Sequence, residues 1–137
     1  MTIADAEQTK GSPLLAIVVG IAGWLVPGLG HVFLRKWGKA LAYFVAVSML
    51  ALVGLMSHGN VFSYGGDALD RLGFLADVGS GVYYFTSHIL FPAGPDVSRA
   101  AGDYGTRLIA TAGVLNLLCV LEGVHIALGN ARERQAA

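Results

Sequence analysis

The 137-residue sequence contains few charged residues and a single cysteine. Only 13% of its residues are Asp, Glu, Lys or Arg, whereas 55% are hydrophobic and the mean hydropathy is +0.62. Soluble domains of ordinary composition carry about 25% charged residues. The scarcity of charge therefore predicts one integral membrane domain, surrounded by the lipid bilayer, in place of a soluble domain.

The charges that are present show no excess of either sign. Nine Lys and Arg balance nine Asp and Glu, so the chain lacks the basic field that binds nucleic acid, and we predict no nucleic-acid partner. Cys119 lies within an apolar run and has no second cysteine to pair with. We expect it to be a small buried hydrophobic residue.

Signatures of catalysis and of cofactor binding are also missing. The sequence has no H-E-x-x-H, phosphate-binding loop, C-x-x-C or Ser-His-Asp signature, so we expect no enzyme activity and no cofactor. Glu122 and His125 form an E-x-x-H spacing, which places a carboxylate and an imidazole on one helical face. Metal sites of that type need two such motifs and two further carboxylates, so the single copy predicts no metal site.

Long uncharged runs predict the fold class, an all-α polytopic membrane helix bundle with four helical segments, of which three or four span the bilayer. About 20 residues at about 1.5 Å each cross a hydrocarbon core of about 30 Å. Pro27 lacks a backbone donor and Gly28 and Gly30 loosen the chain beside it, so the first span should be broken near Pro27. The predicted parts of this single domain, residues 1–137, are a flexible tail at 1–12, a first span at 14–34, a second span at 39–57, a helix at 68–91, a last span at 104–129 and a tail at 130–137.

Residues 68–91 differ from the other runs because they are amphipathic. On a 3.6-residue period their polar side chains fall near one stripe, and their large apolar side chains gather on the other side. The stripe should face protein or water within the bundle. Two alternatives remain open: a full span, or a segment that enters and leaves on one side. The stripe consists of Asp70, Asp77, Ser80, Tyr84 and His88.

Three cations, Arg35, Lys36 and Lys39, lie in the short linker between the first two runs. The positive-inside rule places this loop, residues 35–39, in the cytoplasm and the N-terminus outside, for a multi-pass membrane protein. The rule does not choose between three and four spans, because both give five Lys and Arg inside and four outside.

Asn116 and Glu122 lie inside the last apolar run, where polar groups are costly and normally face the bundle. We expect Asn116 to bond a neighbouring helix and Glu122 to meet a cation or a helix end; an ion or proton path is the alternative. The cationic linker reaches Glu122 only if the last helix ends on the cytoplasmic side, as it does with three spans. The linker groups in question are His31, Arg35, Lys36 and Lys39.

The run L-V-P-G-L-G-H-V-F-L-R-K-W-G-K-A-L resembles the hairpin of the two-transmembrane-helix domain family, whose linker reads roughly G-x-x-G-x-H-R-F-Y-L-G. Val32 stands where that family has Arg, and the family's Tyr is missing. The matching residues are Gly28, Gly30, His31, Phe33, Leu34 and Gly38.

The chain also resembles a bacterial family of small multispan membrane proteins of unknown function. That family joins a P-G-x-G-H hairpin to a last helix reading roughly Y-G-T-x-x-x-x-x-A-G-x-x-N-x-L-x-x-x-[DE]. The resemblance implies a location in a bacterial inner (cytoplasmic) membrane. It leaves residues 57–100 weakly matched and implies no particular activity. The matching residues of the last helix are Tyr104, Gly105, Thr106, Ala112, Gly113, Asn116, Leu118 and Glu122.

Two hypotheses for function follow. The small size, the small-residue helix faces and the lack of catalytic signatures favour a structural or accessory subunit that binds other membrane subunits or a second copy of itself. The polar residues within the runs favour, as the alternative, a small transporter or channel-like oligomer that uses Glu122 and Asn116. The candidate residues for these structural or pathway roles are Pro27, Gly28, Gly30, His31, Arg35, Lys39, Asp77, Asn116, Glu122 and His125.

Overall fold

The structure, a computed structural model, describes residues 13–59, 61–62, 67–90 and 100–135. Within these residues it contains helices and no strand, which confirms the predicted all-α class. The predicted tail at 1–12 lies outside the described residues, whereas residues 130–135, predicted as part of a second tail, continue the last helix. The helices are α2 (Pro13–Leu25), α3 (Leu29–Phe33), α4 (Trp37–Met56), α5 (Ala68–Gly79), α6 (Val82–Leu90) and α7 (Ala100–Gln135).

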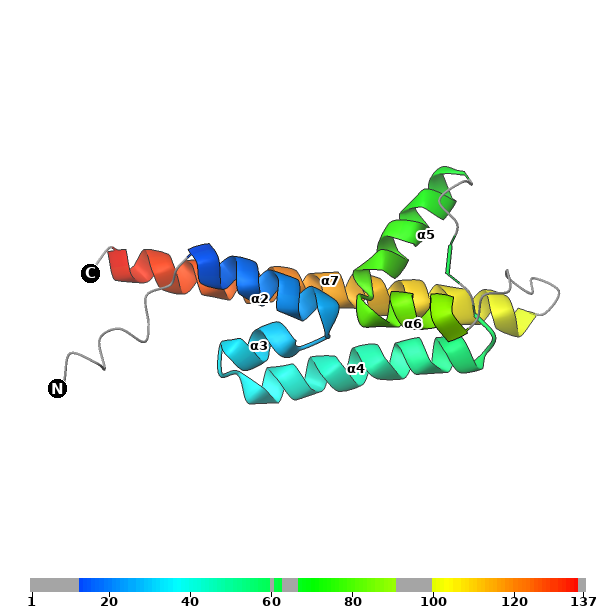
Figure 1. Cartoon of the computed structure of the whole chain (residues 1–137), viewed down its shortest axis with the longest axis horizontal. Coiled ribbons are helices and arrows are strands. Elements are labelled where there is room, and N and C mark those ends of the chain that lie inside the picture. Colours follow the sequence, from blue (N-terminus) through cyan, green and yellow to red (C-terminus); the bar gives the residue numbers. More distant parts are fainter. Residues whose placement is uncertain (1–12, 60, 63–66, 91–99, 136–137) are drawn as a thin grey trace.

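Two long antiparallel helices, α4 and α7, form the frame of the molecule (Figure 1). They are the helices of the described chain that are long and apolar enough to cross a membrane, over Trp37–Met56 and Asp103–Gly129. Near one end they approach closely, because a Cβ on Gly105 would lie 2.6 Å from the carbonyl oxygen of Gly54. The frame therefore contains two candidate spans, and the predicted count of three or four stays a prediction.

The first apolar run forms a helical hairpin and not one long helix. The helix α2 has 13 residues and a length of about 20 Å, which is too short to cross a hydrocarbon core. Pro27 follows it, and Gly28 adopts a φ of 81°, where a side chain would be strained and would collide with the backbone of Ala40. The short helix α3 then returns alongside α2 (Figure 1). Both ends of this run thus lie at the same end of the molecule, where the sequence had predicted a crossing.

The segment predicted at 68–91 also folds as a helical hairpin, from the opposite end of the molecule (Figure 1). Asp67 and Asp70 form a capping box that starts α5. The turn between α5 and α6 contains Gly81, which has a φ of 60°. Neither helix is long enough to span, with 12 and nine residues. Both ends of this hairpin therefore lie toward the same end of the molecule (Figure 1), and the choice between the two alternatives left open by the sequence stays a prediction.

The tips of the two hairpins meet beside the middle of α7. The indole Nε1 of Trp24, near the end of α2, donates to the carbonyl oxygen of Val78, near the end of α5, at 2.9 Å. A Cβ on Gly81 would collide with the carbonyl oxygen of Trp24, so only glycine allows this approach. On the other side of the tips, Val47, Ala51 and Ala112 pack α4 against α7, with Leu50, Tyr83 and Leu115 around them.

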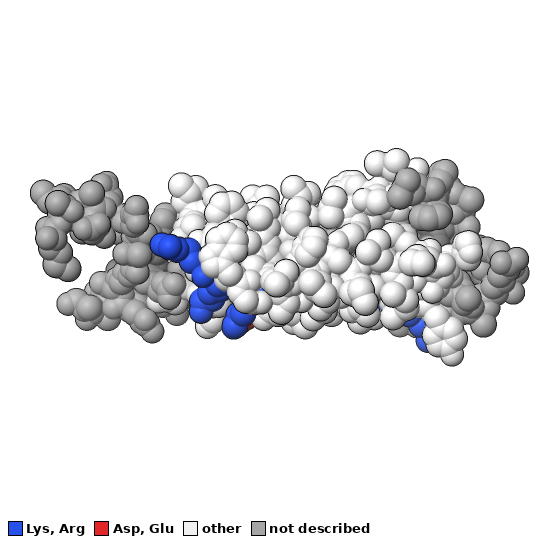
Figure 2. Space-filling model, turned by 90° about the horizontal axis from the view of Figure 1, so that it is seen from below, with Lys and Arg blue, Asp and Glu red and all other residues white. Residues whose placement is uncertain are grey.

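The outer surface of the described helices is largely apolar. Leu41, Met49 and Leu121 are 60% to 65% exposed, and they belong to a set of large exposed hydrophobic side chains to which every described helix contributes. Figure 2 shows this surface from the side of α4, with Lys and Arg side chains toward its two ends and an uncharged surface between them. The charges of that face therefore lie toward the two ends of α4.

Candidate functional site

Two clusters of hydrogen-bonded groups lie along α7 in the bundle interior. We call the first the tip junction, which consists of Trp24, Val78, Gly79 and Asn116. We call the second the ion-pair cluster, which consists of His31, Lys39, Tyr43 and Glu122. Asn116 and Glu122 lie six positions apart on α7, so the two clusters are separated by about 9 Å along that helix.

At the tip junction, Asn116 holds the ends of two helices. Its Nδ2 donates to the carbonyl oxygen of Trp24 at 3.1 Å and to that of Gly79 at 2.8 Å, and the side chain is fully buried. The last four carbonyl groups of a helix have no partner within it. Asn116 therefore supplies donors to α2 and α5, each at the point where its own hydrogen-bond ladder ends.

The chemistry of the junction requires two donors on one short side chain. An Asn amide carries two N–H groups, which match the two carbonyl acceptors and fix the orientation of the amide. A buried carbonyl group without a partner would cost about 1–3 kcal/mol. Asn116 is also the central residue of the candidate span Asp103–Gly129, 13 residues from each end. The junction thus satisfies two helix ends at the level where water would be farthest away.

The ion-pair cluster joins α3, α4 and α7. Lys39 Nζ donates to Oε1 of Glu122, and the hydroxyl of Tyr43 donates to Oε2. The Nε2 atom of His31 lies 3.4 Å from the same Oε2, and the His31 and Tyr43 rings meet edge to face with their centroids 4.8 Å apart. His31 is 2% exposed, whereas Lys39 is 49% exposed. The Glu122 carboxylate is therefore held between a buried imidazole and a half-exposed ammonium group.

The structure brings together some of the predicted site residues and leaves others apart. Pro27 and Gly28 form the turn of the first hairpin, and Gly30 packs against the backbone of Val19. Arg35 and His125 are both exposed. Neither side chain makes a hydrogen bond or ion pair to a described group, so the Glu122 and His125 spacing does not form a pair.

Asp77 occupies a buried position of its own. Its side chain is 0% exposed, and its Oδ2 accepts a hydrogen bond from the backbone N–H of Phe62 at 2.6 Å. Its Oδ1 has no hydrogen-bond partner among the described residues. Tyr84 and His88, predicted on the same stripe, bond to each other at 3.1 Å. The described residues contain no group of three His, Cys, Asp or Glu that could hold a metal ion.

Four members of these clusters were not predicted from the sequence: Val78 and Gly79, which contribute carbonyl oxygens, and the side chains of Trp24 and Tyr43. Tyr43 follows Lys39 by four residues and so shares its face of α4, a signal that could have paired both with Glu122. Trp24 was counted only as part of an apolar run. An indole N–H inside such a run needs an acceptor, and a neighbouring helix end is one source of it.

The chain belongs to the DUF6677 family, a family of unknown function, which matches residues 18–135. This match confirms the expectation of an uncharacterised family. Comparison with curated proteins and with solved structures found no match.

We predict that Asn116→Leu loosens the tip junction. Leucine has the same number of side-chain heavy atoms and the same branching but no donor, so the carbonyl groups of Trp24 and Gly79 lose their partner inside the bundle. The free energy of unfolding in detergent should fall by about 1–3 kcal/mol. Thr111→Val is the matched control, because the exposed Thr111 hydroxyl bonds only to the Arg107 carbonyl group of its own helix. A thermal-unfolding midpoint that falls no further for Asn116→Leu than for the control would contradict the assignment.

We also predict measurable coupling between Lys39 and Glu122. In a double-mutant cycle with Lys39→Met and Glu122→Gln, the double variant should lose less unfolding free energy than the two single variants lose together. The difference should be roughly 1 kcal/mol. Arg107 and Asp103 provide the control cycle, since their ion pair at 3.0 Å is 71% and 60% exposed. Exposed pairs of this kind contribute less than about 0.5 kcal/mol. Equal coupling in the two cycles would show that the ion-pair cluster does not hold the helices together.

Proposed function

We propose that the chain is an integral protein of a bacterial cytoplasmic membrane. In this proposal α4 and α7 cross the bilayer, and the two helical hairpins each enter it halfway, from opposite faces. The apolar exterior supports it, because soluble monomers rarely expose contiguous apolar patches of more than a few hundred Å². The position of charge at the two ends of the described surface supports it as well (Figure 2).

The arrangement of the two hairpins supports one sidedness over the other. Because the start of α2, the linker at 35–36 and the end of α7 lie at one end of the molecule (Figure 1), the chain on that side collects most of the cations. With this side cytoplasmic, the positive-inside count is six against three, in place of the five against four that both simpler topologies give. The six are Lys10, Arg35, Lys36, Lys39, Arg132 and Arg134, and the three are Arg71, Arg99 and Arg107. This topology keeps the linker cytoplasmic and moves the predicted outer N-terminus to the same side.

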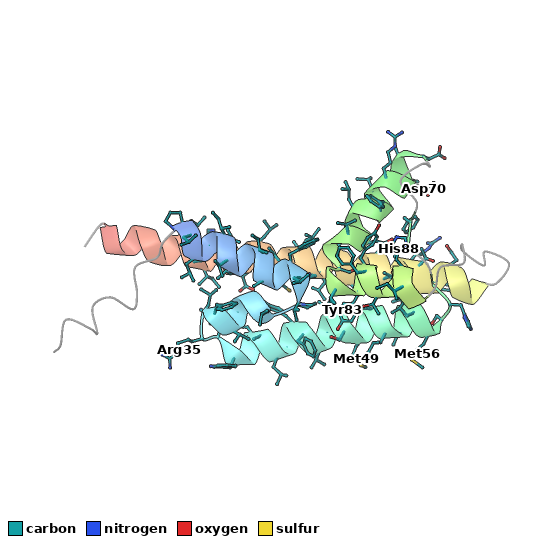
Figure 3. All side chains as sticks on the ribbon, viewed as in Figure 1. Arg35, Met49, Met56, Asp70, Tyr83 and His88 are labelled. Carbon is teal, nitrogen blue, oxygen red and sulfur yellow. The ribbon has the colours of Figure 1, made fainter. Side chains whose placement is uncertain are left out.

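We further propose a structural role, as an accessory subunit that supports the assembly or stability of a membrane complex or of a homo-oligomer. One observation carries this proposal: Asn116 and Glu122, the intraspan groups suited to a transport path, are engaged in joining helices. The side chains that the described helices direct outward are largely apolar. Figure 3 shows Met49 and Met56 of α4 directed away from the bundle, where a neighbouring membrane protein can pack.

Photo-crosslinking in native membranes tests this role. A benzoylphenylalanine placed at Ile21, Met49 or Leu121 probes the outer faces of α2, α4 and α7, and each parent side chain is at least 60% exposed. A subunit with a specific partner should give a discrete protein adduct from one face and not from all three, and the same species should co-elute in mild detergent. Lipid adducts alone from every face, with a monomer on purification, would contradict the structural role. The three positions serve as controls for one another.

A second candidate, a small transporter or channel-like oligomer, is favoured by the interrupted helices. Transporters build midplane sites from discontinuous helices. Here both helix breaks lie near the centre of the candidate span, and the buried Oδ1 atoms of Asp77 and Asn116 have no partner among the described residues. Ion flux into proteoliposomes that is lost in Asp77→Asn would favour this candidate over the structural one.

A further inference from the structure

An apolar groove of about 260 Å³ opens on the outside of the molecule between the first hairpin and α4. Its lining includes Val26, Leu29, Val32, Trp37, Leu41 and Phe44. Along α4 it extends from Trp37 to Phe44, which is seven residues and about 10 Å. It therefore leads from the first residue of α4 toward the turn of the hairpin, as an open slot lined by apolar side chains.

Two exposed cations stand at the outer end of this groove. Arg35 and Lys36 directly precede Trp37, and neither side chain bonds to any group that the structure describes. Lys39, the third cation of the linker, is already bound to Glu122. Figure 3 shows Arg35 directed away from the helices, and the partial positive charge of the α4 N-terminus adds to the local field. The groove thus combines an apolar slot with a cationic entrance.

We propose that this groove binds one anionic phospholipid of the cytoplasmic leaflet, with an acyl chain in the slot and the phosphate at Arg35 and Lys36. The inference rests on the proposed membrane insertion and its sidedness. Charge complementarity selects the ligand: a guanidinium group pairs with phosphate oxygens through two parallel hydrogen bonds, and juxtamembrane cations attract anionic headgroups. Trp37 lies between the two parts of the site, at the level where tryptophan prefers the interface.

Native mass spectrometry of the delipidated full chain tests the headgroup contact. Titration with phosphatidylglycerol should give one tightly retained lipid, bound about 30-fold more strongly than phosphatidylcholine, since two cations contribute. The variant Arg35→Asn with Lys36→Gln should bind both lipids equally; Asn is chosen because Arg35 has a φ of 58°, a conformation that Asn tolerates. The control variant, Arg71→Gln with Arg107→Gln, removes two positive charges at the other end of the molecule. It should keep the preference for phosphatidylglycerol over phosphatidylcholine. Equal affinity of the parent for both lipids, or an unchanged preference in the linker variant, would overturn the proposal.

A second arm tests the acyl slot. Val32→Trp fills the groove from α3 and should weaken binding of both lipids at least tenfold, with an unchanged circular-dichroism spectrum. Leu41→Trp, at a position 65% exposed, repeats the test if the first variant fails to fold. Glycerol 3-phosphate, which has the headgroup chemistry without the chains, should not compete. Competition by glycerol 3-phosphate would show a phosphate site and not a phospholipid site. Extraction of the chain from membranes by alkaline carbonate would refute membrane insertion itself, independently of these results.

Discussion

The structure depends on one constraint: a helix that stops inside an apolar bundle leaves carbonyl groups that must find donors within the protein. Two helices stop there, α2 at Leu25 and α5 at Gly79. Their tips face each other, Trp24 donates across to α5, and Asn116 donates to both. If either hairpin were alone, backbone groups at its tip would have no hydrogen-bond partner. Each tip therefore covers the backbone groups of the other.

This arrangement divides the roles of the helices. The long helices α4 and α7 supply length and the continuous packing surface, and the hairpins fill the two halves of the space beside them (Figure 1). The ion-pair cluster anchors the first hairpin to that frame at its outer part, through His31, Lys39 and Glu122. Polar groups in the interior thereby serve assembly of the fold, and the free cations Arg35 and Lys36 are left at the surface beside an apolar groove.

The sequence predicted the all-α class because its long uncharged runs allow little else. It could not separate a broken span from a hairpin in residues 14–34. Pro27 ends a helix in either case, and the direction of the next helix depends on Gly30 packing against the backbone of Val19. Such a contact between two backbones leaves no periodic pattern of apolar residues in the sequence. For the same reason the break at Gly81, which depends on the approach of Trp24, was not foreseen.

The polar residues were more predictable than the path of the chain. Asn116 and Glu122 were expected to face other helices because a polar group is costly inside an apolar run. The cationic linker was expected near Glu122, and the structure places His31 and Lys39 there. Arg35 and Lys36 have the same sign but lie in the turn before α4, where the direction of the backbone points them outward. The charges of the linker therefore indicated a contact with Glu122, but they did not indicate which of the linker residues make it.

Single-cysteine accessibility tests most directly whether the first apolar run enters and leaves the bilayer on one side. Cys119 is buried and can be replaced by alanine to give a cysteine-free background. Cysteines at Pro13, Lys36 and Leu69, all exposed positions, are then treated in intact cells with a membrane-impermeant maleimide. Positions 13 and 36 should react only after the membrane is permeabilised, whereas position 69 should react directly. Direct reaction at position 13 with protection at position 36 would show instead that the first apolar run crosses the membrane.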